Sequence, residues 1–272
     1  MSDETSNGRN RLKSKHYNTR EEWMDVWNNY KDVQTKEFTE EMIADAVSEI
    51  KEICAGKVPA YAWSGGKDSI ALQIVCEDAG IKKGFCCYND LYFQKSIDFF
   101  YEHCPEGVEI VNTGEDIAWL SRNPKFLFPK GAVAWNVRTH LRYQPIYCKK
   151  NNVDILLMGK RRQDGNWVPD NIVNRSSGGV DIYCPLRHWT HENVICAIRH
   201  RGKTLSRFYL DDEIGFHFGD TKFAIMGPSR GESVCDAWNR IYSVEKMKVI
   251  QCAEHGIESA REYLNKKREG YY

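Results

Sequence analysis

Short apolar runs alternate with longer segments of helical spacing through the middle of the chain. The apolar runs predict strands over 60–63, 84–88, 108–111, 154–158 and 181–184, and the helical spacing predicts helices over 68–79, 96–104, 136–150 and 190–200. Strands that alternate with helices of this length are typical of β-α-β units. The sequence therefore predicts a doubly wound α/β fold with a mainly parallel sheet and flanking helices.

The segments on either side of this central region, residues 58–200, have different patterns. Residues 1–20 are polar and charged, which predicts a flexible tail. Two stretches of helical spacing predict N-terminal helices within 21–57. The pattern of residues 201–272 predicts a C-terminal extension, in which a loop precedes one long helix over 232–267.

The overall composition excludes several classes of protein. Of 272 residues, 42% are hydrophobic and 28% are charged, which excludes a disordered or collagen-like chain. The 38 basic and 38 acidic side chains balance, so there is no global basic field to attract nucleic acid. An apolar leader and an apolar run of about 18 residues are both absent from the sequence, which predicts a cytoplasmic protein without membrane contacts.

Cysteine spacing limits the kinds of metal centre that the chain could hold. The chain has 10 cysteines, and no two of them have the C-x-x-C spacing of zinc ribbons, thioredoxin-like redox pairs and ferredoxin-type clusters. We therefore expect neither an iron–sulfur cluster nor zinc, and mostly buried, reduced thiols.

The most informative segment is the run W-S-G-G-K-D-S at 63–69, between the first predicted strand and the helix that follows it. Amide hydrogens at the start of a helix lack intrahelical partners and favour anions. Gly65 and Gly66 allow backbone amides to converge on one phosphate group, and Lys67 adds a positive charge. The run does not fit a Walker A loop, because Tyr61 and Asp68 occupy two of its required positions.

The run S-G-G-K-D-S resembles the pyrophosphate-binding loop of the PP-loop ATP pyrophosphatase superfamily, whose members have an adenine nucleotide alpha-hydrolase-like (HUP-like) fold. The resemblance implies that the loop binds the β and γ phosphates of ATP and that the bond between the α and β phosphates is cleaved. It implies nucleotide-binding roles for the residues of this run, which are Trp63, Ser64, Gly65, Gly66, Lys67, Asp68 and Ser69.

Two later segments resemble the phosphoadenylyl sulfate (PAPS) reductase-like branch of that superfamily, which includes the ATP sulfurylase small subunit. The stretch 156–164 is similar to a strand-end G-x-R element, with Gly159 and with Arg161 or Arg162 in the place of its arginine. The stretch 184–194 is similar to a P-x-x-x-W-T-x-x-D-V segment, although Asn193 replaces the acidic residue. The resemblance covers residues 58–200 and implies a role in sulfur metabolism.

These resemblances lead to one hypothesis of function. We expect an enzyme that binds Mg-ATP, adenylylates an unidentified acceptor and releases pyrophosphate, with Lys67, Ser64 and Arg161 as its catalytic residues. Asn89 and Asp90 follow the second predicted strand, where they would meet adenine or ribose. Asp68 beside a polyanion would need a Mg²⁺ ion between them, so it is the candidate metal ligand.

The sequence is also compatible with two alternative functions. The chain could be a thiol-dependent PAPS reductase with Cys252 as its nucleophile, although its surroundings do not match the reductase tail motif. It could instead be the nucleotide-binding component of a nucleic-acid modification or defence complex, with basic clusters at 149–162 and 199–207. A homodimer or a partner subunit is compatible with either hypothesis.

Overall fold

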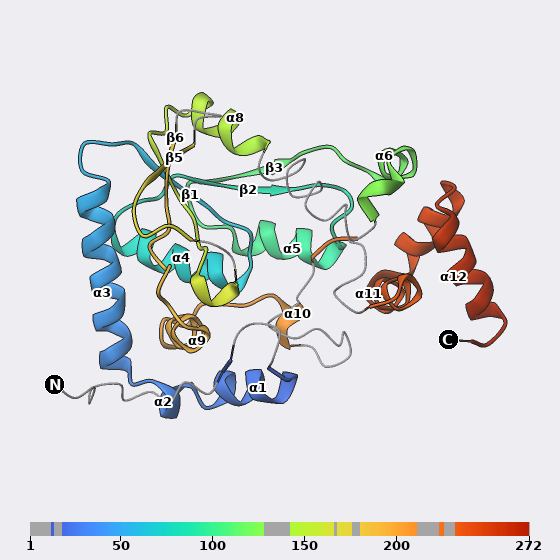
Figure 1. Ribbon diagram of the computed structural model, residues 1–272, viewed down its shortest axis with the longest axis horizontal. Coiled ribbons are helices and arrows are strands. Elements are labelled where there is room, and N and C mark those ends of the chain that lie inside the picture. Colours follow the sequence, from blue (N-terminus) through green and yellow to red (C-terminus); the bar gives the residue numbers. More distant parts are fainter. Residues whose placement is uncertain are drawn as a thin grey trace.

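The computed structural model describes residues 12–13, 18–127, 142–165, 168–175, 180–210, 223–225 and 232–271. Its centre is a sheet with the strand order β3-β2-β1-β4-β6-β5 (Figure 1). The strands are β1 (Pro59–Ala62), β2 (Gly84–Tyr88), β3 (Val108–Asn112), β4 (Ile155–Leu157), β5 (Val173–Arg175) and β6 (Val180–Tyr183). All pairings are parallel except that of β5 with β6, so the predicted α/β class and mainly parallel sheet are confirmed.

Helices precede the sheet, connect its strands and follow it. They are α1 (Arg20–Asn28), α2 (Tyr30–Val33), α3 (Lys36–Ile53), α4 (Lys67–Asp78), α5 (Gln94–His103), α6 (Ile117–Arg122), α8 (Tyr143–Lys150), α9 (His191–His200), α10 (Arg207–Leu210), α11 (Val234–Glu254) and α12 (Glu258–Arg268). Short 3₁₀ turns lie at η1 (Pro124–Leu127) and η3 (Arg162–Asp164). The predicted helix over 136–150 is observed from residue 143, Arg142 is its N-cap, and residues 136–141 lie outside the described residues.

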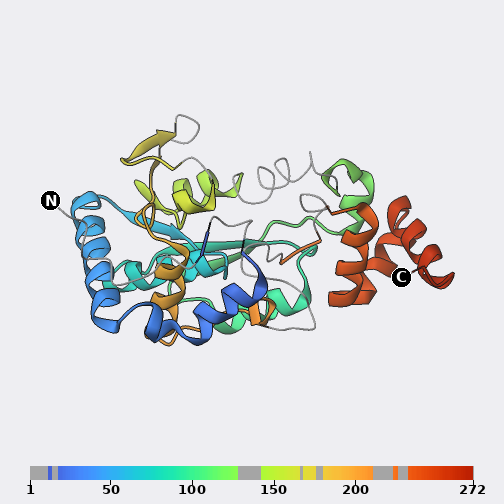
Figure 2. The same ribbon diagram turned by 60° about the horizontal axis from the view of Figure 1, so that its bottom comes forward.

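The two faces of the sheet are covered by different helices, as Figure 2 shows for α8 on one side and α4, α5 and α9 on the other. Side chains alternate between the faces, as the pleat of a strand requires. Tyr61 and Cys86 pack in the cluster formed with α4, α5 and α9, whereas Ala60 and Cys87 pack in the cluster formed with α8. Because both faces are buried, every residue of β2 is buried.

The N-terminal helices extend the layer on the α4 side, where α9 contacts α1, α2, α3 and α4. Helix α1 begins at a capping box in which the Thr19 hydroxyl accepts a hydrogen bond from the Glu22 amide, and this cap directs Trp23 inward. Trp23 is fully buried in the main core. The N-terminal helices therefore belong to the same core as the sheet.

The prediction of one long C-terminal helix is wrong, because the segment forms two helices. Gly256 has a φ of +89°, a left-handed conformation that ends α11 before α12 begins. Helix α11 also bends at Glu245, whose Oε2 accepts a 2.9 Å hydrogen bond from the amide of Gln94, the first residue of α5. Helices α11 and α12 pack together at one end of the molecule, beside α6 (Figure 1).

All 10 cysteines are free thiols, as expected, and 7 of them are buried. Among the helices that the structure describes, none combines the length and the apolar character that a bilayer crossing requires.

Candidate functional site

The loop 63–66 connects β1 to α4 at the point where the strand order reverses. From β1 the chain continues to β2 and β3 on one side of the sheet, and later returns to β4 and β6 on the other side. In open α/β sheets, ligands bind in the crevice at such a point, beyond the carboxyl ends of the strands.

The two glycines of this loop have different structural roles. Gly65 has a φ of +65°, and a Cβ placed there would lie 2.8 Å from Phe100 Cε1 of α5, so the position requires glycine. Gly66 is the N-cap of α4 and makes no side-chain capping hydrogen bond. Neither glycine amide donates a hydrogen bond to any residue of the described part of the chain. These amides are therefore available to an anion.

Ser69 shapes the loop from the first turn of α4. Its hydroxyl donates a 2.8 Å hydrogen bond to the Gly66 carbonyl and accepts one of 3.1 Å from the Ser64 amide. The Ser64 hydroxyl lies 3.3 Å from the Ser69 hydroxyl oxygen, and Ser64 is exposed. Ser69 thus holds the backbone, whereas Ser64 stands at the surface of the loop.

Lys67 is buried beneath α1 and does not extend into solvent. Its Nζ lies 2.9 and 2.7 Å from the two carboxylate oxygens of Asp68 and 5.9 Å from the centre of the Trp23 ring. The residue is 2% exposed. Burial lowers the pKa of Lys67, and the neighbouring Asp68 carboxylate opposes that shift.

Arg161, which follows β4, is fully buried and joins this group from the neighbouring strand. Its Nε donates a 2.8 Å hydrogen bond to Asp68, and its Nη2 donates one of 2.8 Å to Asp164. Its Nη1 donates to the Trp189 carbonyl at 3.2 Å. Two cations and two carboxylates therefore form one neutral network, with Asp68 shared by Lys67 and Arg161.

Gly159 allows β4 and α4 to approach each other closely enough for this network to form. A Cβ at Gly159 would lie 2.8 Å from the Asp68 carbonyl oxygen. The structure thus brings together Ser64, Gly65, Gly66, Lys67, Asp68, Ser69, Gly159 and Arg161 from the predicted set.

The other predicted residues have different partners. Arg162 is half-exposed and pairs with Asp170 at the surface, so Arg161 alone of the two arginines joins the network. The indole of Trp63 donates a 3.0 Å hydrogen bond to Gln73 and is buried in the core, which leaves only its backbone near the loop.

The two residues after β2 that were predicted to contact adenine or ribose form hydrogen bonds with neighbouring segments of the chain. Asn89 is fully buried, and its side-chain oxygen accepts from the Leu91 amide at 3.2 Å. The Asp90 carboxylate accepts from Asn112 at 2.8 Å, and its carbonyl accepts from Lys248 Nζ of α11 at 2.9 Å. In this structure Asn89 and Asp90 connect β2 to β3 and to α11.

Three residues of the site were not anticipated from the sequence. The Tyr209 hydroxyl accepts a 3.1 Å hydrogen bond from the Lys67 amide, and Trp23 covers the Lys67 side chain. His191 Nδ1 lies 3.0 Å from Arg161 Nη2; since a guanidinium only donates, Nδ1 accepts and the ring proton is on Nε2. No local pattern marks Tyr209 or Trp23, because both reach the loop from remote segments.

No protein-family model and no curated protein sequence matches the chain. Among solved structures, it is similar to a PAPS reductase from Candida auris in a phosphate complex, with 11% identity, a TM-score of 0.49 and coverage of 64% of this chain and 90% of the other. It is also similar to FMN adenylyltransferase from Candida glabrata in complex with FAD and inorganic pyrophosphate (13% identity, TM-score 0.43, 71% and 67% coverage). A third similar structure is NMN synthetase from Francisella tularensis (16% identity, TM-score 0.46, 79% and 95% coverage).

All three TM-scores lie below 0.5 and all three identities are 16% or lower, so these similarities do not establish a family for this chain. They assign no activity to this chain.

Proposed function

We propose that the chain is an ATP-using adenylyltransferase of the PAPS reductase-like type, with its nucleotide site at the β1–α4 loop. One observation carries the proposal: the Gly65 and Gly66 amides have no partner in the described part of the chain and lie at an uncapped helix start. Two buried cations, Lys67 and Arg161, bind the carboxylate of Asp68 in the first turn of the same helix.

In the proposed reaction, an oxygen or sulfur nucleophile of the acceptor attacks the α-phosphorus of ATP. The bond between that phosphorus and the α–β bridging oxygen breaks, its electron pair leaves with pyrophosphate, and the acceptor's proton passes to solvent. The Gly65 and Gly66 amides would bind the departing phosphates, and the Ser64 hydroxyl would donate to them. Lys67 and Arg161 would add positive potential from below the loop.

The charge balance of the site fits a requirement for Mg²⁺. Because Lys67 and Arg161 are already paired with Asp68 and Asp164, a polyanion would need a further cation. Asp68, with a side chain 30% exposed, is the residue that would hold Mg²⁺. A single carboxylate together with phosphate oxygens and water is a common set of magnesium ligands. The ion would supply charge neutralisation for the leaving group.

The thiol-dependent reductase has less support. Cys252 is fully buried within α11, and burial raises the pKa of its thiol to about 12. The thiolate is the nucleophilic form, so this environment suppresses the reactivity that a reductase would need.

A nucleic-acid-binding role also has less support, because residues of the two basic clusters have local partners. Lys150 pairs with Glu109, and Arg201 pairs with Glu40 and Asp78. Arg199 stacks over the rings of Trp27 and Tyr30. A patch that is neutralised in this way attracts phosphate only weakly.

The proposal is tested by an inventory of products after the chain is mixed with Mg-ATP and a panel of sulfur and oxygen nucleophiles. We expect pyrophosphate and an adenylylated product.

Since charge-assisted contacts contribute about 1.5–3 kcal/mol, Lys67→Ala should reduce pyrophosphate release roughly tenfold or more. Lys51→Ala, at an exposed position of α3, is the matched control and should leave the rate unchanged. An undiminished rate in Lys67→Ala would exclude the loop, and sulfite release from PAPS offered in parallel would favour the reductase.

A further inference from the structure

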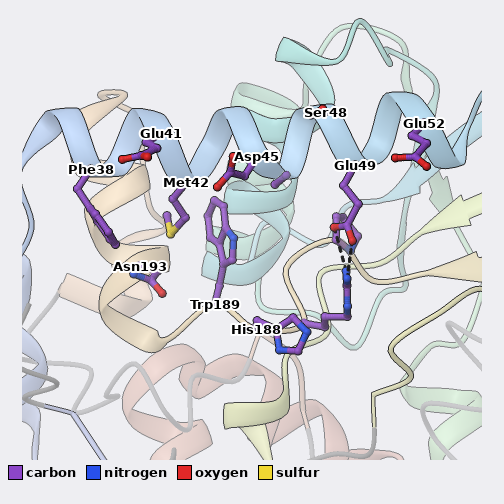
Figure 3. A pocket seen from close by; sticks show the side chains of 13 residues that line it. Phe38, Glu41, Met42, Asp45, Ser48, Glu49, Glu52, His188, Trp189 and Asn193 are labelled. Carbon is purple, nitrogen blue, oxygen red and sulfur yellow. Dashed lines mark hydrogen bonds and ion pairs between the residues drawn. The ribbon is translucent and has the colours of Figure 1, made fainter. Parts of the chain in front are cut away.

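A groove of about 1000 Å³ runs along α3, and no residue of the loop 63–69 lines it. One wall is the face of α3 from Phe38 to Glu52, and the other is the segment 185–193, which leads into α9 (Figure 3). The groove is therefore a feature separate from the candidate nucleotide site.

The α3 wall carries an excess of negative charge. Glu41, Asp45 and Glu52 are exposed, and their carboxylates have no hydrogen-bonding or ion-pair partner in the described ranges of the chain. Glu49, between them, is neutralised by Arg187, whose Nη atoms lie 3.0 and 2.5 Å from its carboxylate and lower its pKa. Like charges at i and i+4, as at Glu41 and Asp45, destabilise an isolated helix. The cost of this arrangement would be relieved by a cationic partner.

Apolar side chains lie between the charged positions. Figure 3 shows Phe38 and Met42 on α3 pointing toward the side of Asn193 and Trp189. Phe38 is 43% exposed at one end of the groove. Carboxylates that border an apolar strip match a ligand that is both basic and amphipathic.

We propose that this groove binds a basic amphipathic helix of a partner protein. From Phe38 to Glu52 the wall is about 21 Å long, which matches roughly four turns of an α-helix. Lysine or arginine side chains of that helix would face Glu41, Asp45 and Glu52, while its leucine-type side chains would cover Phe38 and Met42. The sign of the charge disfavours nucleic acid as the occupant.

The groove is physically connected to the candidate nucleotide site. The ring of Trp189 lines the groove, and the carbonyl of the same residue accepts the 3.2 Å hydrogen bond from Arg161. The proposal concerns binding at the groove and does not depend on the activity of the loop. Lys67→Ala should therefore bind a partner helix as the unsubstituted chain does, which separates a failure of one proposal from a failure of the other.

The first test measures the fluorescence anisotropy of a labelled synthetic peptide of about fifteen residues, with lysines on one helical face and leucines beside them. We expect saturable binding that weakens with salt. Two control peptides should bind with affinities at least roughly tenfold lower than that of the basic amphipathic peptide. One control has glutamate in place of lysine, and the other has the same composition in an order that breaks the amphipathic pattern. Equal binding of all three peptides would overturn the proposal.

The second test reverses charge on the groove. Glu41→Lys combined with Asp45→Lys should weaken binding of the basic peptide by about tenfold or more, because attraction becomes repulsion. Glu254→Lys combined with Glu262→Lys, at exposed positions of α11 and α12, is the matched control and should leave the affinity unchanged. Circular dichroism verifies that both variants fold. Equal affinities of the two variants for the basic peptide would contradict the proposal. A dimer of the unsubstituted chain that dissociates in the Glu41→Lys, Asp45→Lys variant would also contradict it, because the occupant of the groove would then be a second copy of this chain.

Discussion

Arg161 and Asp68 are 93 positions apart in the chain, yet Arg161 Nε donates a 2.8 Å hydrogen bond to Asp68 Oδ1. This contact joins the end of β4 to the first turn of α4, across the point where the strand order reverses. Because Lys67 binds the same carboxylate, the two cations of the candidate site depend on each other through Asp68.

Replacement of Arg161 should destabilise the protein. Arg161→Ala would leave Asp68 and Asp164 without their shared partner, and the loss of one member of a buried pair costs about 3–5 kcal/mol. We expect the lower end of that range, because the Asp68 side chain is 30% exposed. Urea unfolding measures the change. Arg162→Ala, which removes an exposed pair with Asp170, is the control and should cost at most about 1 kcal/mol. Equal losses of unfolding free energy in the two variants would contradict the claim that Arg161, and not Arg162, holds the network together.

The two glycines of the loop should respond differently to alanine. Gly65→Ala places a side chain at a φ of +65° and 2.8 Å from Phe100, so we expect a loss of stability of at least about 1–2 kcal/mol. At Gly66 the φ is −78° and the nearest atoms to a new Cβ lie at 3.4 Å, so the loss should stay below about 1 kcal/mol. Thermal unfolding measures both. A larger loss in Gly66→Ala than in Gly65→Ala would contradict this account of the loop.

On the proposed function, Gly66→Ala should weaken ATP binding despite its mild effect on stability. The added methyl group would stand at the helix start, where the phosphates are proposed to approach the amides. Isothermal titration with Mg-ATP measures the change, with Lys51→Ala as the control for an exposed position. An unchanged affinity would place the nucleotide elsewhere.

Burial of Lys67 should make stability depend on pH in the alkaline range. The pKa of Lys67 is lowered from its ordinary value of 10.5, so in a window below pH 10.5 the unfolded chain binds more protons than the native chain. The free energy of unfolding of the unsubstituted chain, relative to that of Lys67→Met, should therefore rise with pH in this window. Urea unfolding of both proteins between neutral and alkaline pH gives the difference. A fall with increasing pH would mean that the pair with Asp68 outweighs burial.

Cys252 should be unreactive in the native protein. Because burial raises the pKa of its thiol to about 12, roughly one thiol in ten thousand is ionised at pH 8. Mass spectrometry after brief alkylation should show modification of the half-buried Cys235 before Cys252, and the difference should disappear in urea. Rapid native labelling of Cys252 would restore support for the thiol-dependent alternative.

The sequence predicted those features that depend on neighbours along the chain. The short apolar runs of β1 and β2, the helical spacing of α4, and the glycine pair between β1 and α4 are local properties, and each element is observed where its pattern lies. The break between α11 and α12 was missed, although Gly256 stands there, because the apolar positions continue in helical spacing on both sides.

By itself, then, the sequence determined the α/β class, the strand–turn–helix unit at 59–78 and the candidate chemistry of its loop. Only the tertiary structure decided that Arg161, and not Arg162, donates a hydrogen bond to Asp68. It also decided that the Lys67 side chain lies beneath the Trp23 ring and that the Tyr209 hydroxyl accepts a hydrogen bond from the Lys67 amide. Local periodicity arises from backbone geometry between near neighbours. These contacts arise from the packing of segments that are far apart in the chain, and that packing is set by the order of strands in the sheet.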